Sequence, residues 1–164
     1  MNWPSWMLWG FVSTLLMTTM EAGAQAVGLT RVDFPFMIGT IFTTDRDRAK
    51  IYGFLAHVLN GWVFSLLYVL AFESWHQASW WRGALIGAVH ALFVLLVVMW
   101  IMPGIHPRMA SEQHGPTATR QLEPPGFLGL NYGVQTPLSV FISHVVFGSV
   151  LGAFYQLAGH SFLK

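Results

Sequence analysis

The sequence has no cysteine and very little charge. Without cysteine, the 164-residue chain can form no disulfide, no thiolate-bound metal site, no cysteine-held iron–sulfur cluster and no cysteine nucleophile. Only 9% of its residues are Asp, Glu, Lys or Arg, whereas an average soluble domain has about 25%. The net charge is +1 and no basic run occurs, so nucleic acid is not an expected partner.

Apolar residues are abundant instead. Hydrophobic residues make up 54% of the chain and the mean hydropathy is +0.53. A soluble domain of this size buries only about two-thirds of the surface that its unfolded chain exposes, so it could not hide so much apolar area. The low charge and the 15% aromatic content also exclude disorder. We therefore expect an integral membrane protein whose first partner is the lipid bilayer.

Four stretches reach the roughly 20 apolar residues that a membrane-spanning helix needs. They are residues 6–28, 51–72, 83–102 and 137–157. We expect them to form one all-α transmembrane domain over residues 1–164, a polytopic four-helix bundle with the loops 29–50 and 103–136 on the same side. No Lys or Arg precedes the first stretch, so we interpret it as a span and not as a cleaved signal peptide.

The positive charges are divided unevenly between the two sides of the predicted membrane. Six of the eight Lys and Arg residues fall in the loops 29–50 and 103–136, which we call the loop side. The positive-inside rule then makes the loop side cytoplasmic and both termini periplasmic. We expect a multi-pass protein of a bacterial inner membrane.

The chain also contains an internal repeat. The pattern F-x-x-H-V-x-x-G-x-V-x-x-x-x-Y occurs without a gap at residues 54–68 and again at 141–155. The preceding segments 35–42 and 125–132 are similar to each other in their Pro, Gly and aromatic residues. The repeat predicts two similar helical hairpins related by a pseudo-two-fold axis along the membrane normal.

Each predicted span carries one strong polar group: Glu21, His57, His90 and His144. Ionisable residues inside a membrane are energetically expensive, so each is a functional candidate. With a rise of 1.5 Å per residue, three of them fall at about the same depth and His90 falls nearer the termini. Three further candidates lie on the same helix faces as the histidines, namely Asn60, Gly61 and Gly148.

Several interpretations of these polar groups stay open. The one we favour is structural: neutral histidines that hydrogen-bond across the bundle with Glu21, Asn60 or Ser143, with no cofactor. A second makes His57 and His144, with His90 beside them, the ligands of a b-type haem. A third uses Glu21, His57 and His144 as a two-histidine, one-carboxylate set for a divalent metal. A fourth is a path for protons or a small solute.

The loop 103–136 contains three further candidates, His106, Arg108 and Tyr132, at the mouth of the predicted bundle. Its apolar second half predicts packing against the helices and not free solvent. We favour the interpretation that His106 and Arg108 satisfy loop carbonyls, over a role in a binding site.

The segments Gly53–Tyr68, Gly104–Met109 and Pro124–Gly133 resemble those of small uncharacterised bacterial inner-membrane proteins. The resemblance covers most of the chain. It implies four helices and a bacterial membrane, and it implies no activity. The chain also lacks the G-x-S-x-G, H-E-x-x-H, P-loop and G-x-G-x-x-G motifs, so no class of enzyme is indicated.

The function we expect is that of a non-catalytic accessory or structural subunit, bound to other membrane subunits or to a second copy of itself. The first alternative is a membrane redox protein that binds haem or a metal through His57 and His144. The second alternative is a small permease or a proton-conducting protein.

Overall fold

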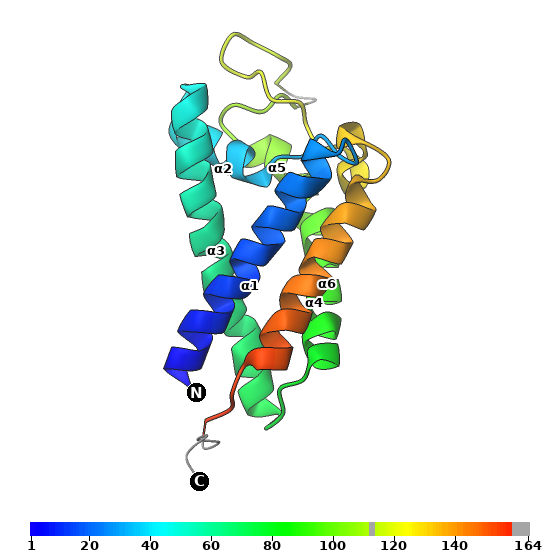
Figure 1. The fold of residues 1–164 in the computed structure, drawn as a ribbon. Coiled ribbons are helices and arrows are strands. Elements are labelled where there is room, and N and C mark those ends of the chain that lie inside the picture. The colour runs from blue at the N-terminus through cyan, green and yellow to red at the C-terminus, as the bar shows by residue number, and fades with distance from the viewer. Residues whose placement is uncertain (112–113, 159–164) are drawn as a thin grey trace.

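The structure, a computed structural model, describes residues 1–111 and 114–158, which form an all-α fold. This part of the chain has six α-helices, one π-helical turn, one 3-10 segment and no strand. In order they are α1 (Trp3–Ala26), α2 (Phe34–Phe42), α3 (Arg46–Ser74), α4 (Trp80–Phe93), η1 (Val94–Val98), α5 (Met99–Ile105), η2 (Phe127–Tyr132) and α6 (Thr136–Phe154). Figure 1 shows that α1 begins and α6 ends at the end of the molecule opposite α2.

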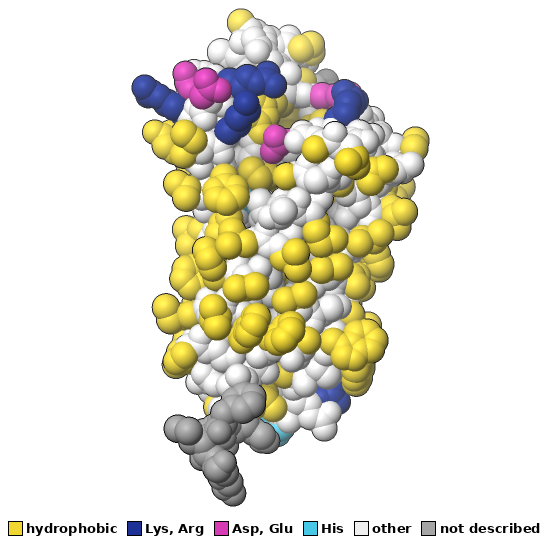
Figure 2. Space-filling view, in the orientation of Figure 1, with side chains coloured by type: hydrophobic (Ala, Val, Ile, Leu, Met, Phe, Trp, Pro, Cys, Tyr) yellow, Lys and Arg dark blue, Asp and Glu magenta, His cyan; other side chains and the backbone are white. Residues whose placement is uncertain are grey.

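Three helical segments are long and apolar enough to cross a membrane: α3, the continuous segment Trp80–Ile105, and α6. Hydrophobic side chains cover the middle of the molecule, and charged side chains gather at the end that carries α2 (Figure 2). Helix α1 has 24 residues and packs against both α3 and α6. It is less apolar because its buried face consists mainly of Ser, Thr and Gly. Three of the four predicted spans are thus shown, and the crossing by α1 stays a prediction.

The sequence placed some helix ends wrongly. The loop 29–50 contains a helix of its own, α2, and α3 already begins at Arg46 because the Asp45 carboxylate accepts a hydrogen bond from the Arg48 N–H at 2.8 Å. The third span does not stop at 102 but continues through Pro103 to Ile105. A proline in the last turn removes only one backbone hydrogen bond, so the helix tolerates it there.

The predicted similarity of residues 35–42 and 125–132 does not extend to their backbone. The first segment lies in a regular α-helix, whereas the second forms a 3-10 turn in which Leu128 has a φ of 54° and Gly129 a φ of 76°. The pseudo-two-fold bundle is therefore not confirmed.

Small residues let the helices approach closely. Helices α1 and α3 run antiparallel, with Gly10 against Ser65, Thr14 against Gly61 and Thr18 against His57. Successive contacts are four residues apart on both helices, and the residue numbers rise along α1 while they fall along α3. This is the regular contact that small residues permit between membrane helices.

Helices α4 and α6 pack even more tightly, through backbone contacts. A Cβ atom on Gly83 would overlap the Gly148 carbonyl oxygen, and one on Gly87 would overlap the His144 carbonyl oxygen. Helix α2 lies on α3 in the same way, with Gly39 against the Ala49 carbonyl. These glycines fix the spacing of the helices and therefore the positions of the polar residues between them.

We expect Gly87→Ala to destabilise the fold, because its Cβ would push α4 away from α6. Overpacking at a tight contact costs roughly 1–3 kcal/mol, which thermal unfolding in detergent would detect as a lower melting temperature. Gly104→Ala is the matched control, since a Cβ there meets no atom within 4 Å. Equal melting temperatures for the two variants would contradict the contact.

The segment after α5 folds back onto α2. The Arg108 guanidinium donates to the carbonyls of Thr40 and Ile41, which end α2 without partners inside that helix. The His106 ring donates from Nε2 to the Met37 carbonyl at 2.9 Å and accepts at Nδ1 from the Arg108 backbone N–H at 3.1 Å. These polar contacts tie the beginning of the loop to α2. Its apolar second half packs on the helices as predicted, since Tyr132 lies in one hydrophobic cluster with Phe34 and Leu95.

A second set of contacts holds the end of this loop. The Tyr132 hydroxyl donates to the Glu123 carbonyl, and Arg31 forms an ion pair of 3.2 Å with the Glu123 carboxylate. Arg31 also donates to the Asn131 carbonyl. Burial and the neighbouring Glu123 charge raise the pKa of Tyr132 to about 12, so its phenol keeps its proton and remains a donor.

We expect acid to loosen the loop through His106. Burial, and to a smaller extent the charge of Arg108, lower the pKa of His106, against the opposing effect of the bond to Met37. The unfolded chain therefore gains a proton at His106 near pH 6.5 while the folded chain resists it. The contribution of His106 to stability is complete above that pH and is lost as the pH falls below it.

The measurement is the melting temperature in detergent between about pH 8 and about pH 5, where His106 titrates in the unfolded chain. In His106→Gln, whose amide can still donate to Met37, the fall in melting temperature should be smaller than in the unchanged protein. The same fall in both proteins would show that His106 is not responsible.

Candidate functional site

All four intramembrane ionisable residues line one cavity. Its volume is about 160 Å³, and the side chains come from four different helices: Glu21 from α1, His57 from α3, His90 from α4 and His144 from α6. Helix α1 packs against both α3 and α6, α2 lies on α3, and α4 pairs with α6. The cavity lies among these helices. Its other walls are formed by Met17, Phe34, Met37, Ile38, Asn60, Gly61, Phe64, Phe93, Val94, Val98 and Met102.

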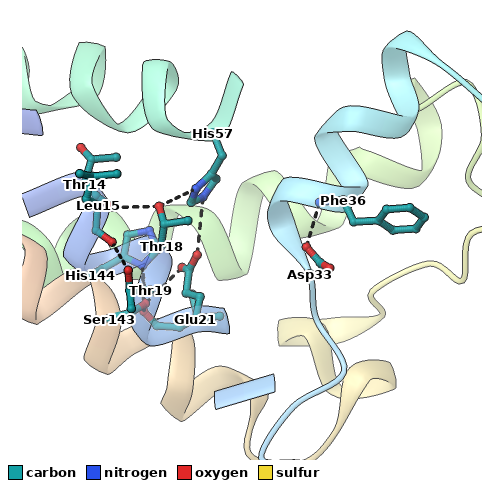
Figure 3. A network of polar contacts seen from close by, with 11 residues as sticks. Thr14, Leu15, Thr18, Thr19, Glu21, Asp33, Phe36, His57, Ser143 and His144 are labelled. Carbon is teal, nitrogen blue, oxygen red and sulfur yellow. Dashed lines mark hydrogen bonds and ion pairs between the residues drawn. The ribbon is translucent and has the colours of Figure 1, made fainter. Parts of the chain in front are cut away.

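The buried pair of Glu21 and His57 is the centre of the site (Figure 3). The Oε2 atom of Glu21 lies 3.6 Å from Nε2 of His57, and both side chains are more than nine-tenths buried. This oxygen has no hydrogen-bond partner among the described residues. At 3.6 Å, a small rotation of the carboxyl group brings the two atoms within hydrogen-bond distance.

Helix α1 fixes the tautomer of His57. The Thr18 hydroxyl donates to the Thr14 carbonyl at 2.8 Å, and its oxygen lies 3.1 Å from Nδ1 of His57. Because the single proton of the hydroxyl is already used, Nδ1 must be the donor. The Nε2 atom of a neutral His57 is then an acceptor that faces Glu21, so the pair holds one proton that can sit on either residue.

Helix α6 supports the other oxygen of Glu21. The Ser143 hydroxyl lies 3.3 Å from Oε1 of Glu21 and 3.0 Å from the Val140 carbonyl. The same carbonyl accepts from Nδ1 of His144 at 2.8 Å, which leaves Nε2 of a neutral His144 as an acceptor. Figure 3 shows Glu21, His57, Ser143 and His144 directed toward one another from three helices.

His90 offers the opposite hydrogen-bonding character. Its Nδ1 lies 2.9 Å from the Tyr68 hydroxyl, which has no other partner among the described residues. When this hydroxyl donates, the proton of neutral His90 sits on Nε2. The His90 ring stacks on Phe64 and meets His144 edge to face, with 4.8 Å between the ring centroids. Two adjacent imidazoles thus offer one donor and one acceptor.

An aromatic cluster packs next to the cavity, around the Tyr68 hydroxyl that bonds to His90. Tyr68, Phe72 and Phe147 are almost fully buried in this cluster. The rings of Tyr68 and Phe147 meet edge to face at 5.1 Å. Below this cluster, the Tyr155 hydroxyl donates to Glu73 at 2.6 Å and ties the end of α6 to the end of α3.

The haem hypothesis does not fit this geometry. Both nitrogens of the His57 ring face protein partners, Nδ1 toward Thr18 and Nε2 toward Glu21. A haem iron bound by His57 and His144 would have to displace Glu21 from His57. The third candidate ligand, His90, is held by Tyr68 and stacked on Phe64. The cavity is shaped for something smaller than a macrocycle.

The metal hypothesis is not supported either. Within residues 1–111 and 114–158, no group of three or more His, Asp or Glu side chains has an arrangement that could hold a metal ion. Glu21 and His57 approach each other, but His144 does not join them in such a group.

The other candidate site residues from the sequence lie partly at the cavity and partly elsewhere. Asn60 and Gly61 line the cavity as their helix face predicted, while Gly148 lies against Gly83 in the contact of α6 with α4. His106, Arg108 and Tyr132 are not among the cavity-lining residues. His106 and Arg108 bond to carbonyls of α2, and Tyr132 bonds to the Glu123 carbonyl.

Sequence reasoning missed two important residues, Thr18 and Phe34. Thr18 lies one turn before Glu21 on α1, and this spacing could have indicated it. Phe34 lines the cavity with its ring nearly parallel to that of His57. It lies in a segment that the sequence predicted as a loop, so no pattern pointed to it. Ser143, which the sequence offered as a partner of the histidines, hydrogen-bonds to Glu21 instead.

The chain has no significant match to a family model, a curated protein or a solved structure.

We expect Thr18→Val to lower stability, because it removes the one acceptor that the described residues offer to the buried Nδ1–H of His57. Leaving such a donor unpaired costs roughly 1–3 kcal/mol. Thr19→Val is the matched control: the Thr19 hydroxyl also bonds to its own helix, but it is exposed. Thermal unfolding of both variants in detergent measures the difference. Equal losses would argue against an ordered Thr18–His57 bond.

Proposed function

We propose that this protein is a small permease or proton-conducting membrane protein, which carries protons through the cavity of Glu21, His57, His90 and His144. The observation that supports this most is the meeting of four ionisable side chains from four helices at one cavity. Ionisable residues that face a cavity inside a membrane mark proton relays and solute pathways in pumps and transporters.

The Glu21–His57 pair suits proton transfer because it can exchange a proton without losing its supports. With one proton, the pair is neutral overall, either as a carboxylic acid and an imidazole or as a carboxylate and an imidazolium. In both forms the Thr18 oxygen can accept from Nδ1 of His57, and the Ser143 hydroxyl can remain beside Glu21. Uptake of a second proton gives a carboxylic acid beside an imidazolium, and its release restores the neutral pair.

The rest of the cavity can continue the path through water. A cavity of about 160 Å³ has room for several water molecules, and a polar lining is what holds water inside a protein. The Nε2–H of His90 and the Nε2 lone pair of His144 would hold such waters as donor and acceptor. A proton could then move from the Glu21–His57 pair to either imidazole.

We further propose that α1 is a fourth span and that the protein lies in a bacterial inner membrane with both termini periplasmic. The charge distribution between the two sides supports this orientation. The predicted repeat also has support, since each hairpin places its histidine and the following glycine opposite small residues. These pairs are His57 with Thr18, Gly61 with Thr14, His144 with Gly87 and Gly148 with Gly83.

The accessory-subunit hypothesis stays a prediction. A helix surface that faces lipid and one that faces another subunit are both apolar, so the exposed hydrophobic residues favour neither.

We expect purified protein in liposomes to conduct protons, and Glu21→Gln to abolish this conduction. The glutamine side chain keeps the size and the hydrogen-bonding capacity of Glu21 but cannot release a proton. A pH-sensitive dye inside the liposomes reports the flux driven by a potassium diffusion potential. Glu123→Gln is the control, because Glu123 is exposed and lies in the loop, paired with Arg31.

Two results would contradict the proposal. One is a proton flux for the unchanged protein no greater than that of empty liposomes, in the presence and absence of small candidate solutes. The other is a proton flux that is equal in the Glu21→Gln and Glu123→Gln variants.

A further inference from the structure

A second, larger cavity lies beside the first and shares Glu21 with it. Its volume is about 310 Å³. It is formed by the last turns of α1, the start of α2 and the first turns of α3, at the end of the molecule where charged side chains gather. We call it the outer cavity, and the cavity of the three histidines the inner cavity. The outer cavity is lined by Thr18, Thr19, Glu21, Ala22, Gln25, Val32, Asp33, Phe34, Pro35, Phe36, Lys50 and Phe54.

Glu21 and Phe34 line both cavities, and Thr18 bonds to His57. Glu21 is almost fully buried, and its Oε2 has no hydrogen-bond partner among the described residues. An unpaired buried carboxyl oxygen is expensive unless water reaches it. The boundary between the two cavities therefore contains one proton-accepting group and one apolar ring.

Phe34 is held firmly in this boundary. It is the first residue of α2, and the Asp33 carboxylate caps that helix by accepting from the Phe36 N–H at 2.8 Å (Figure 3). Helix α2 is in turn fixed on α3 by the close contact of Gly39 with Ala49. The Phe34 ring is buried and lies nearly parallel to the His57 ring, with 6.3 Å between the centroids.

The lining of the outer cavity favours water over an ionic solute. Its polar side chains, Thr19, Gln25, Asp33 and Lys50, offer several donors and acceptors, which is the condition for ordered water. Asp33 and Lys50 have opposite charges, so the two together attract neither anions nor cations strongly. Tyr68, Phe72 and Phe147 form a buried aromatic cluster next to the inner cavity, beside His90.

We propose that the outer cavity is a water-filled vestibule that delivers protons to Glu21 from the loop side only, and that the Phe34 ring keeps bulk water out of the inner cavity. This inference rests on the proposed function, because it gives that function its entrance. In this proposal a proton enters through Glu21, and the Phe34 ring separates the outer cavity from the inner cavity.

Because the chain has no cysteine, single cysteines can report where water reaches. Phe54, which is 44% exposed, lines the outer cavity, whereas its neighbour Leu55, which is 60% exposed, does not line it and lies on the surface of α3 that we expect to face lipid. Thiols react as thiolates, so a charged, membrane-impermeant methanethiosulfonate reagent should modify Phe54→Cys at least about tenfold faster than Leu55→Cys. The reaction in liposomes should occur only when the reagent is on the loop side, identified by protease cleavage of the loop 103–126.

A second pair of variants tests the role of Phe34. Val94 lines the inner cavity, and we expect Val94→Cys to react slowly. Adding Phe34→Ala should open the boundary and raise that rate by about tenfold or more, since the thiol would then be hydrated. Phe34→Leu, which keeps an apolar side chain of similar length, should leave the rate low. Gel filtration of each variant shows first that it is folded.

The inference is overturned if Phe54→Cys and Leu55→Cys react at equal rates, if Phe54→Cys reacts from the terminal side, or if Phe34→Ala leaves the Val94→Cys rate unchanged. Labelling needs no proton flux, so the two proposals fail separately. A vestibule that reacts as expected in a protein without flux would remove the proposed function alone. A flux that depends on Glu21 without a reactive vestibule would remove only this entrance.

Discussion

The structure depends most on the cost of placing the Glu21 carboxyl group in the interior of a hydrophobic bundle. Such a group needs hydrogen-bonding partners or a shared proton, because hydrocarbon offers neither. Helix α3 supplies His57 and α6 supplies Ser143, so three helices have to converge at this depth. Helix α1 meets the same need with Thr18, whose hydroxyl holds His57 in the orientation that faces Glu21.

This convergence is possible only because small residues let the helices come close. Gly10, Gly61 and Thr14 bring α1 against α3, and Gly83 and Gly87 bring α4 against α6. Larger side chains would move each histidine away from the cavity by pushing the helices apart. The glycines therefore set the distances between the helices, and these distances allow the polar groups to interact.

The sequence predicted a helical membrane protein, the positions of three spans and the four polar groups, because these follow from hydropathy and helical spacing. It could not predict α2, since nine apolar residues between two spans look the same in a loop or in an interfacial helix. For that reason Phe34 was missed. The haem and metal hypotheses rested on residue types alone, and the sequence could not show that Glu21 lies 3.6 Å from Nε2 of His57. Tertiary pairing decided that point.

The π-helical turn η1 sets the phase of the third span. The buried residues of the third span follow one another at intervals of four residues: Gly83, Gly87, Ala91, Leu95 and Met99. In a regular α-helix each such step rotates the face by about 40°, so Met99 would point well away from Gly83. The wider turn at Val94–Val98 absorbs part of this rotation and keeps one continuous stripe directed inward. A single insertion or deletion in η1 would therefore rotate α5, and the loop attached to it, relative to the histidine cavity.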